Sequence, residues 1–255
     1  MDIPRRHIAL RAIHQTHCDD CALNPVCLPP ALEASEVHLL DEIVARNRPL
    51  PRGAVLFHEG LPFNALFTVR SGAIKTYNST PAGEEQVTGF YLPGEIFGLD
   101  SIGSPNGKYG STAIALETTT VCVLPFDALE TLGRKLPSLQ RHLNQLMSSE
   151  IRADQHIMQL VGRRTADQRI ASFLLTLSAR YKRRHLSEND LHLPMSRSDI
   201  ANHLGLALET VSRIFTRFQQ VGVLQVSGRD VVIANRQSLI ELADGKTESV
   251  TCNSK

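Results

Sequence analysis

Residues 196–224 read SRSDIANHLGLALETVSRIFTRFQQVGVL, a pattern typical of two short helices joined by a tight turn. Ser196 and Asp199 have the spacing of a capping box, which places the start of the first helix here. Gly205 permits the tight turn that follows this helix. The second helix then has an apolar side made of Val211, Ile214, Phe215 and Phe218. This arrangement predicts a helix-turn-helix.

The opposite face of the second helix carries polar side chains at helical spacing. Its members are Glu209, Ser212, Arg213 and, one turn later, Arg217. Arg213 has the fork that binds guanine O6 and N7, and Glu209 can accept a hydrogen bond from cytosine N4. Arg217 is better suited to a phosphate, and Ser196 and Arg197 are further candidate DNA contacts. We interpret this face as the DNA-reading surface; the alternative is an ordinary solvated helix face.

Two β-type runs follow the second helix, at residues 223–226 and 231–233, and a Ser227-Gly228 turn separates them. Such a hairpin is the wing that commonly packs beside these helices. The C-terminal part is therefore predicted to be a winged helix-turn-helix. In a dimer, this module would bind a two-fold palindrome with half-sites about one helical turn apart.

Upstream of this module, a helical pattern of more than twenty residues begins after Pro137. One stripe of it consists of Met147, Ile151, Asp154, Met158 and Val161, separated by 4, 3, 4 and 3 residues. This heptad-like seam predicts a parallel homodimer; the alternative is packing of the stripe on the protein's own β-domain. Two copies of Asp154 would bring like charges together and weaken the dimer, unless this side chain leans out to solvent or pairs with Arg152.

Further upstream, between about residues 51 and 126, the chain consists of short β-type runs separated by glycines. The runs are residues 55–57, 66–69, 73–77, 86–91, 111–116 and 120–124. Short strands with turn residues at regular spacing predict an antiparallel sandwich or roll.

The composition is that of a globular protein, since 42% of the 255 residues are hydrophobic and 21% are charged. We expect a cytoplasmic protein without a membrane partner, because no apolar run approaches the ~18 residues of a spanning helix and the start lacks a signal peptide. Residues 1–160 hold 13 Lys and Arg against 17 Asp and Glu, whereas residues 161–255 hold 14 against 9. The basic C-terminal part is compatible with nucleic-acid binding.

Cys18, Cys21 and Cys27 form a C-x2-C-x5-C pattern in a proline-rich segment that we expect to be neither helix nor strand. Five cysteines, three of them close together, indicate metal binding rather than a disulfide framework. A cubane iron–sulfur cluster takes four thiolates and tolerates one distant ligand. Cys122 is the obvious fourth ligand.

Two alternatives stay open on spacing alone. Cys122 on an apolar strand could be a buried structural cysteine. Zinc could be held by the three clustered cysteines with His14 or His17, although the second close pair of ligands usual for zinc is missing.

The cysteine loop, β-roll, long helix and winged helix-turn-helix occur in the order of the FNR/ANR regulators, a branch of the CRP superfamily that this chain resembles over nearly its whole length. The matching segments include the cysteine triad, RSGAIK from Arg70, GEEQVTGF from Gly83, ALET from Ala115, MSSEI from Met147 and LETVSR from Leu208. The resemblance implies an α+β fold whose N-terminal antiparallel β-roll is of the cupin-like, cyclic-nucleotide-binding type. It implies a ligand loop at 1–30, a sensor roll at 31–135, a dimerisation helix at 136–164, a winged helix-turn-helix at 165–240 and a tail at 241–255.

The resemblance also implies a function, that of an oxygen-sensing global regulator of anaerobic metabolism. It assigns one oxygen-labile [4Fe–4S] cluster per chain to Cys18, Cys21, Cys27 and Cys122. It assigns the reading of double-stranded DNA, at a TTGAT-N4-ATCAA type of palindrome, to Glu209, Ser212 and Arg213. Oxygen would inactivate such a regulator.

RNA polymerase is the second partner that the resemblance implies, through two surfaces. One lies in the loop 80–89 and includes Gly83, Glu84 and Glu85. The other includes Ser71 and Thr118. One departure from the family pattern is Ala207 before the recognition helix, where the loss of a capping Ser or Thr should cost ~1 kcal/mol.

A cyclic-nucleotide sensor is the second hypothesis among regulators. Its pocket needs an arginine on the phosphate, but no arginine occurs between Arg70 and Arg134, and Lys108 offers charge without a fork. We therefore expect no cyclic nucleotide. A haem sensor stays open, because ten histidines are available and haem needs only one or two ligands. An enzyme has no support from motif spacing, and we expect Cys252 to be a free surface thiol.

Overall fold

The structure, a computed structural model, describes residues 17–27, 32–80, 83–104 and 106–246. His14 and Cys252, and parts of the predicted ligand loop, sensor roll, hairpin loop 80–89 and tail, lie outside these ranges. The chain divides into two compact units. The first comprises Met1–Thr76 with Phe90–Asn144, and the second comprises Tyr77–Gly89 with Gln145–Lys255.

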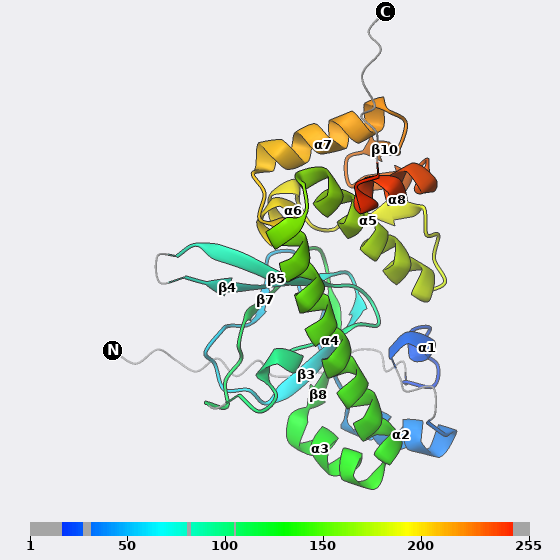
Figure 1. Cartoon of the computed structure of the whole chain (residues 1–255). Helices are drawn as coiled ribbons and strands as arrows, with labels where there is room; N and C mark the ends of the chain where they lie inside the picture. The colour runs from blue at the N-terminus through cyan, green and yellow to red at the C-terminus, as the bar shows by residue number, and fades with distance from the viewer. Residues whose placement is uncertain (1–16, 28–31, 81–82, 105, 247–255) are drawn as a thin grey trace, which may run out of the picture. The chain divides into compact units, whose positions relative to one another are not determined.

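The β-roll consists of two four-stranded sheets with the orders β1-β8-β3-β6 and β2-β7-β4-β5 (Figure 1). Its strands are β1 (Ala45–Arg46), β2 (Val55–Phe57), β3 (Ala65–Ser71), β4 (Ile74–Ser79), β5 (Glu85–Tyr91), β6 (Ile96–Phe97), β7 (Thr112–Ala115) and β8 (Thr120–Pro125). The antiparallel roll is thus confirmed, and each of the six predicted runs overlaps a strand. The two-residue strands β1 and β6 were not predicted.

Aromatic rings from both sheets fill the core of the roll. Phe57 of β2 stacks on Tyr109 with 4.0 Å between ring centroids and on Phe67 of β3 with 5.3 Å. Phe67 in turn stacks on Phe97 of β6 with 5.5 Å between centroids. Since each such pair adds about 0.5–1.5 kcal/mol beyond area burial, these contacts hold the two sheets together.

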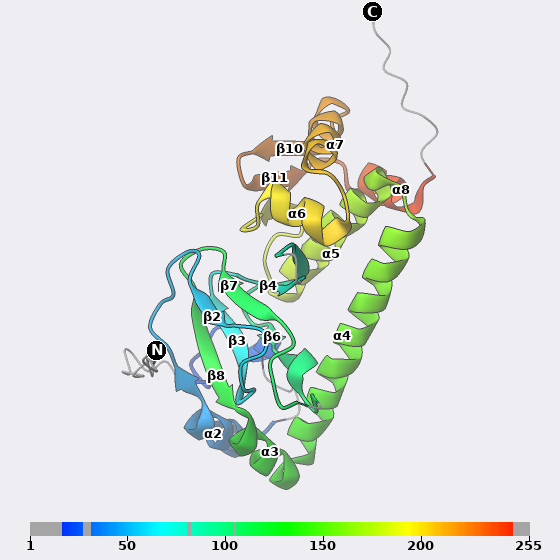
Figure 2. The same ribbon diagram turned by 90° about the vertical axis from the view of Figure 1, so that its left-hand side faces the viewer.

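Three helices flank the roll in the first unit, and a fourth leads out of it. They are α1 (Asn24–Cys27), α2 (Ala34–Ile43), α3 (Phe126–Lys135) and α4 (Pro137–Arg163), and a 3-10 turn, η1, spans Leu99–Ser101. Helices α2 and α3 pack side by side, and α3 also contacts β3 and β8 (Figure 2). Our expectation that the cysteine segment is neither helix nor strand is wrong, because Cys27 closes the one-turn helix α1. Pro25 is compatible with this helix, since a first-turn N–H needs no intrahelical partner.

The long helix expected after Pro137 is α4, with 27 residues. Near its start Leu139 and Leu143 are buried. Farther along, Ile151 is 58% and Met158 66% exposed. No helix in the described ranges is long and apolar enough to cross a bilayer.

The second unit contains the predicted winged helix-turn-helix. Its elements after α4 are α5 (Ala166–Arg183), β9 (Asp190–His192), α6 (Arg197–Leu204), α7 (Leu208–Gln220), β10 (Leu224–Ser227), β11 (Asp230–Ile233) and α8 (Arg236–Asp244). Strands β10 and β11 form the expected wing, and β9 adds a third strand in the order β10-β11-β9. Figure 2 shows this hairpin beside α7.

Candidate cysteine site and DNA-binding surface

Cys122 lies in the middle of β8, the strand that pairs with both β1 and β3. Its cross-strand partners are Arg46 of β1 and Thr68 of β3. Thr68 is buried, whereas Cys122 is half-buried. Cys122 therefore lies between an arginine and a threonine in the middle of a sheet.

The other three cysteines lie on the segment that ends in α1. The backbone N–H of Cys21 donates to Cys18 O at 3.3 Å, and that of Cys27 donates to Leu23 O at 2.8 Å. These turns bend the segment into a compact loop. All four cysteines in the described part of the chain are free thiols.

Burial is the main influence on the pKa values of three of these thiols, and neighbouring groups modify it. Burial raises the pKa of Cys27 to about 12; a hydrogen bond with Thr68 opposes this, and Cys122 and Cys21 raise it further. Burial also raises the pKa of Cys122, with Arg46 opposing and Cys21 adding to the rise. Burial and the neighbouring Asp41 raise the pKa of Cys18, and Cys27 adds a smaller rise. Thr68, the cross-strand partner of Cys122, thus also lies within reach of Cys27, so the loop contacts the strand that carries the fourth thiol.

In the described residues, however, no three His, Cys, Asp or Glu side chains are arranged closely enough to hold a metal ion. Raised thiol pKa values mean that a metal would have to displace protons, because thiolates are the ligands. The four thiols fit a cluster in number and chemistry.

Asp41 of α2 anchors the start of the loop. Its Oδ1 accepts the backbone N–H of Cys18 at 2.9 Å, and its Oδ2 lies 2.6 Å from His17 Nδ1. Arg46 forms an ion pair with Asp41 and also donates to Cys18 Sγ at 4.0 Å. Burial raises the pKa of Asp41, but the hydrogen bonds from His17, Cys18 and Arg46 outweigh it and hold the pKa well below its usual value. Sequence spacing gave no signal of this anchor, because the ionic groups come from three separate segments.

Gly94 is the contact that lets α1 dock on the roll. It has φ +88°, and a Cβ there would come within 2.9 Å of Val26 Cγ1. Such a distance is shorter than side-chain contacts allow, so only glycine fits beneath α1.

We expect Gly94→Ala to undock the cysteine loop. An overpacked contact costs about 1–3 kcal/mol, so Cys27 in metal-free protein should be alkylated about tenfold faster or more, as measured by mass spectrometry. Gly60→Ala is the matched control, because Gly60 has φ +80° but nothing within 4 Å of the added Cβ. Equal alkylation rates in the two variants would mean that only backbone strain matters.

The helix-turn-helix has the local structure that the sequence predicts. Ser196 Oγ accepts from Asp199 N at 3.0 Å, and Asp199 Oδ2 accepts from Ser196 N at 2.9 Å, which completes the capping box of α6. Gly205 ends α6 in the left-handed region with φ +61°. The predicted apolar side of α7 is buried, with Val211, Ile214, Phe215 and Phe218 at 4% exposure or less. No side chain caps α7 at Ala207, as expected from its type.

The candidate DNA contacts lie in two places, on α7 and at the start of α6. Glu209, Ser212, Arg213 and Arg217 are exposed on α7. Arg217, however, forms an ion pair with Asp167 of α5. Arg197 stacks on the Phe215 ring at 3.5 Å from the centroid, and burial lowers its pKa to about 10. Its guanidinium therefore also braces α6 against α7.

The two sets of candidate polymerase contacts differ in location. Ser71 and Thr118 are both exposed, and a Cβ on Gly72 would come within 2.6 Å of Thr118 O, so the two segments touch. Gly83, Glu84 and Glu85 lie on the hairpin between β4 and β5, where Glu84 N donates to Thr80 Oγ1 at 3.1 Å. Within the second unit, Asn202 of α6 donates to Glu85 O at 2.6 Å. The sequence analysis did not predict this hydrogen bond of the Asn202 side chain.

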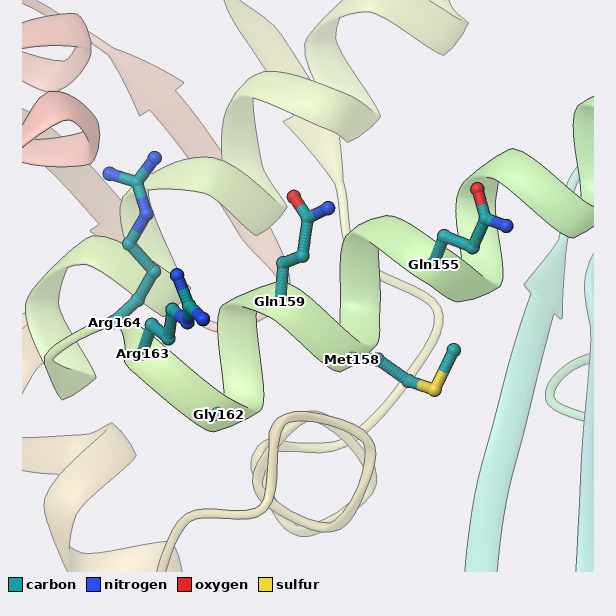
Figure 3. Close-up of a pocket in the computed structure, with 6 residues that line it drawn as sticks. All are labelled: Gln155, Met158, Gln159, Gly162, Arg163 and Arg164. Atoms are coloured by element: carbon teal, nitrogen blue, oxygen red, sulfur yellow. The ribbon is translucent and has the colours of Figure 1, made fainter.

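The predicted seam of α4 includes the exposed side chains of Ile151 and Met158. An open hollow near the end of α4 is lined by Gln155, Met158, Gln159, Gly162, Arg163 and Arg164. Figure 3 shows these residues along the end of one helix, with the Met158 side chain projecting from it. Arg152 donates to Ser148 Oγ at 2.7 Å.

Comparison with known proteins adds to this geometry. Family models match twice: a cyclic nucleotide-binding domain at residues 47–135 and a Crp-like helix-turn-helix domain at residues 168–242. The transcriptional activator protein anr of Pseudomonas aeruginosa is 52% identical over 241 residues, which cover 94% of this chain and 98% of the relative. The fumarate and nitrate reduction regulatory protein of Escherichia coli is 42% identical over 234 residues, which cover 92% of each chain. The structure of FixK2 from Bradyrhizobium japonicum has a TM-score of 0.70 and 32% identity, and the match covers 78% of this chain and 97% of that one.

The roll, the long helix and the winged helix-turn-helix thus define a DNA-binding transcription regulator of the Crp type. More particularly, the chain belongs to the FNR/ANR branch of the CRP/FNR family. It is a regulator of the anaerobic class and not an enzyme.

Proposed function

We propose that this regulator senses oxygen through one [4Fe–4S] cluster per chain, held by Cys18, Cys21, Cys27 and Cys122, and works in the cytoplasm as a homodimer on palindromic DNA. The observation that carries the proposal is that Arg46, the cross-strand partner of Cys122, also donates to Cys18 Sγ at 4.0 Å, so a loop with three free thiols lies against the strand with the fourth. When bound, the cluster supplies an oxygen-labile link between the loop and β8.

The four cysteines would act by fixing the loop on the roll. Val26 already packs on Gly94, and Asp41 already holds the N–H of Cys18, so ligation needs to order only a short segment. Ordering energy of this kind can shift a marginal equilibrium between monomer and dimer.

The dimer would form along α4, through Met147, Ile151, Asp154, Met158 and Val161. Exposed Ile151 and Met158 support this pairing, because a second copy would cover apolar surface that is open to solvent here. Two copies of Asp154 would bring like charges together across the seam and weaken the dimer. If oxygen destroyed the cluster, the loop would no longer be ordered, and nothing would offset the repulsion between the two copies of Asp154.

On DNA, Glu209, Ser212 and Arg213 would read each TTGAT-type half-site. Arg217 would break its ion pair with Asp167 and bind a phosphate instead. Arg197 and Ser196 would add contacts from the start of α6. Activation, or repression at some promoters, would use RNA polymerase contacts at Ser71 with Thr118 and at the hairpin with Gly83, Glu84 and Glu85.

A cyclic nucleotide is not part of this proposal. Aromatic rings fill the core of the roll, and no arginine lies between Arg70 and Arg134 to bind a phosphate. A haem sensor is the competing hypothesis. A sharp Soret band in anaerobic protein would support haem, whereas a cluster gives a broad brown absorption.

The proposal is tested by binding of the palindrome to protein kept without oxygen and to the same sample after exposure to air. We expect specific binding, in the usual range of about 10⁻⁸–10⁻¹¹ M, only before exposure. Equal affinity in both samples would contradict oxygen sensing.

Asp154→Ala should make metal-free protein more dimeric. Removing two like charges from the seam eliminates their repulsion, so sedimentation should show a larger dimer fraction than in the parent at equal concentration. Asp127→Ala is the control, because it removes an exposed carboxylate from α3 instead. An Asp154→Ala variant that is no more dimeric than the parent would show that this residue does not limit dimerisation.

A further inference from the structure

Arg169 of α5 makes an unusual number of contacts with backbone carbonyls. Its Nε donates to Arg164 O at 3.0 Å, its Nη1 to Leu204 O and Gly205 O at 3.0 and 3.3 Å, and its Nη2 to Val161 O at 2.6 Å. All of these residues belong to the second unit. One guanidinium therefore joins the end of α4 to the turn of the helix-turn-helix.

The chemistry of these acceptors explains why arginine suits this position. Val161 is in the last turn of α4, and Leu204 is the last residue of α6. The last carbonyls of a helix have no intrahelical partner and carry the negative end of its dipole. A planar fork with a fixed positive charge can satisfy two helix ends at once, which a lysine point charge cannot do.

The side chains around Gly205 are closely packed. Gly205 is in the left-handed region, and a Cβ there would lie 3.4 Å from Val161 Cγ1 and 3.7 Å from Arg169 Nη1. Val161 belongs to the predicted dimer seam, and α7 begins at Leu208, three residues after Gly205. The end of the seam and the start of the recognition helix are thus held by one side chain.

We infer that Arg169 is a positioning residue that fixes α7 relative to the dimer helix and so sets the half-site spacing that the dimer accepts. This inference rests on the proposed dimer and its palindrome. Without the fork, each helix-turn-helix still folds and still reads a half-site. The spacing between two recognition helices is no longer held.

The test compares the parent, Arg169→Lys and Arg163→Lys as full-length proteins purified without oxygen. Arg163→Lys is the matched control, since it makes the same change on the exposed last residue of α4. Binding is measured to palindromes with three, four or five base pairs between half-sites and to a single half-site, with sedimentation on each protein.

We expect the parent and Arg163→Lys to prefer the four-base-pair spacer by about tenfold or more, because only that site engages both subunits without strain. Arg169→Lys should bind the three spacings within about twofold of one another, with its half-site affinity and dimer fraction unchanged. Unchanged half-site binding also shows that the variant is folded.

A variant that keeps the spacing preference of the parent would overturn the role of Arg169 alone. If half-site binding falls along with the preference, Arg169 serves folding rather than spacing, and the inference is again overturned. A parent that binds no palindrome would refute the proposed function itself, and the spacing role with it.

Discussion

Cys122→Ala should leave anaerobically purified protein without a stable cluster and therefore without specific DNA binding. The three loop cysteines would then have no fourth thiolate on the sheet, where Cys122 lies opposite Arg46 and Thr68. Cubane clusters require four ligands, so iron per chain should fall from about four to near zero. Palindrome affinity should fall toward the non-specific level, a loss of about 10³-fold or more.

Cys252→Ala is the control for this substitution, because it removes a thiol from the C-terminal tail. It should keep the iron content and the affinity of the parent. Removing the small, half-buried side chain of Cys122 should also leave the fold intact, which a thermal melt of the metal-free protein would show. A Cys122→Ala variant with its full iron content would mean that the fourth ligand is elsewhere.

Arg213→Ala should produce the second large effect, on sequence discrimination. A bidentate contact with guanine contributes about 1–3 kcal/mol, and a dimer loses two of them, so palindrome affinity should fall by at least about tenfold. Binding to unrelated DNA should change much less, because phosphate contacts supply it. Competition assays with single-base changes in the half-site would measure the loss.

Arg217→Ala is the informative comparison. This side chain pairs with Asp167 and has no expected base contact, so its removal should weaken binding to all sequences alike and reduce the salt slope by about 1 per subunit. If Arg213→Ala instead weakened every sequence equally, Arg213 would be a phosphate contact rather than a base contact.

The helix-turn-helix could be predicted closely because its signals are local. Ser196 with Asp199 and the glycine at 205 fix the ends of α6 through neighbours in the sequence, and the structure confirms both. Strands β1 and β6 could not be predicted, since two residues show no alternation. A proline-rich segment does not predict the helix α1, although a first helical turn accepts Pro25.

The cysteine site was only partly accessible to sequence reasoning. The spacing of Cys18, Cys21 and Cys27 is a local signal, whereas the position of Cys122 depends on the order of the sheet. The anchor formed by Asp41 and Arg46 joins segments with no pattern between them, and its ion pair is visible only in three dimensions. The same holds for Arg169, whose partners are backbone atoms that any residue supplies.

Iron and acid-labile sulfide per chain, measured with the absorption spectrum on protein purified without oxygen and again after air exposure, test the central claim most directly. We predict about four of each and a broad absorption near ~400 nm that bleaches in air. Zinc, or no metal, in the anaerobic protein would contradict the claim and leave a DNA-binding regulator whose signal enters elsewhere.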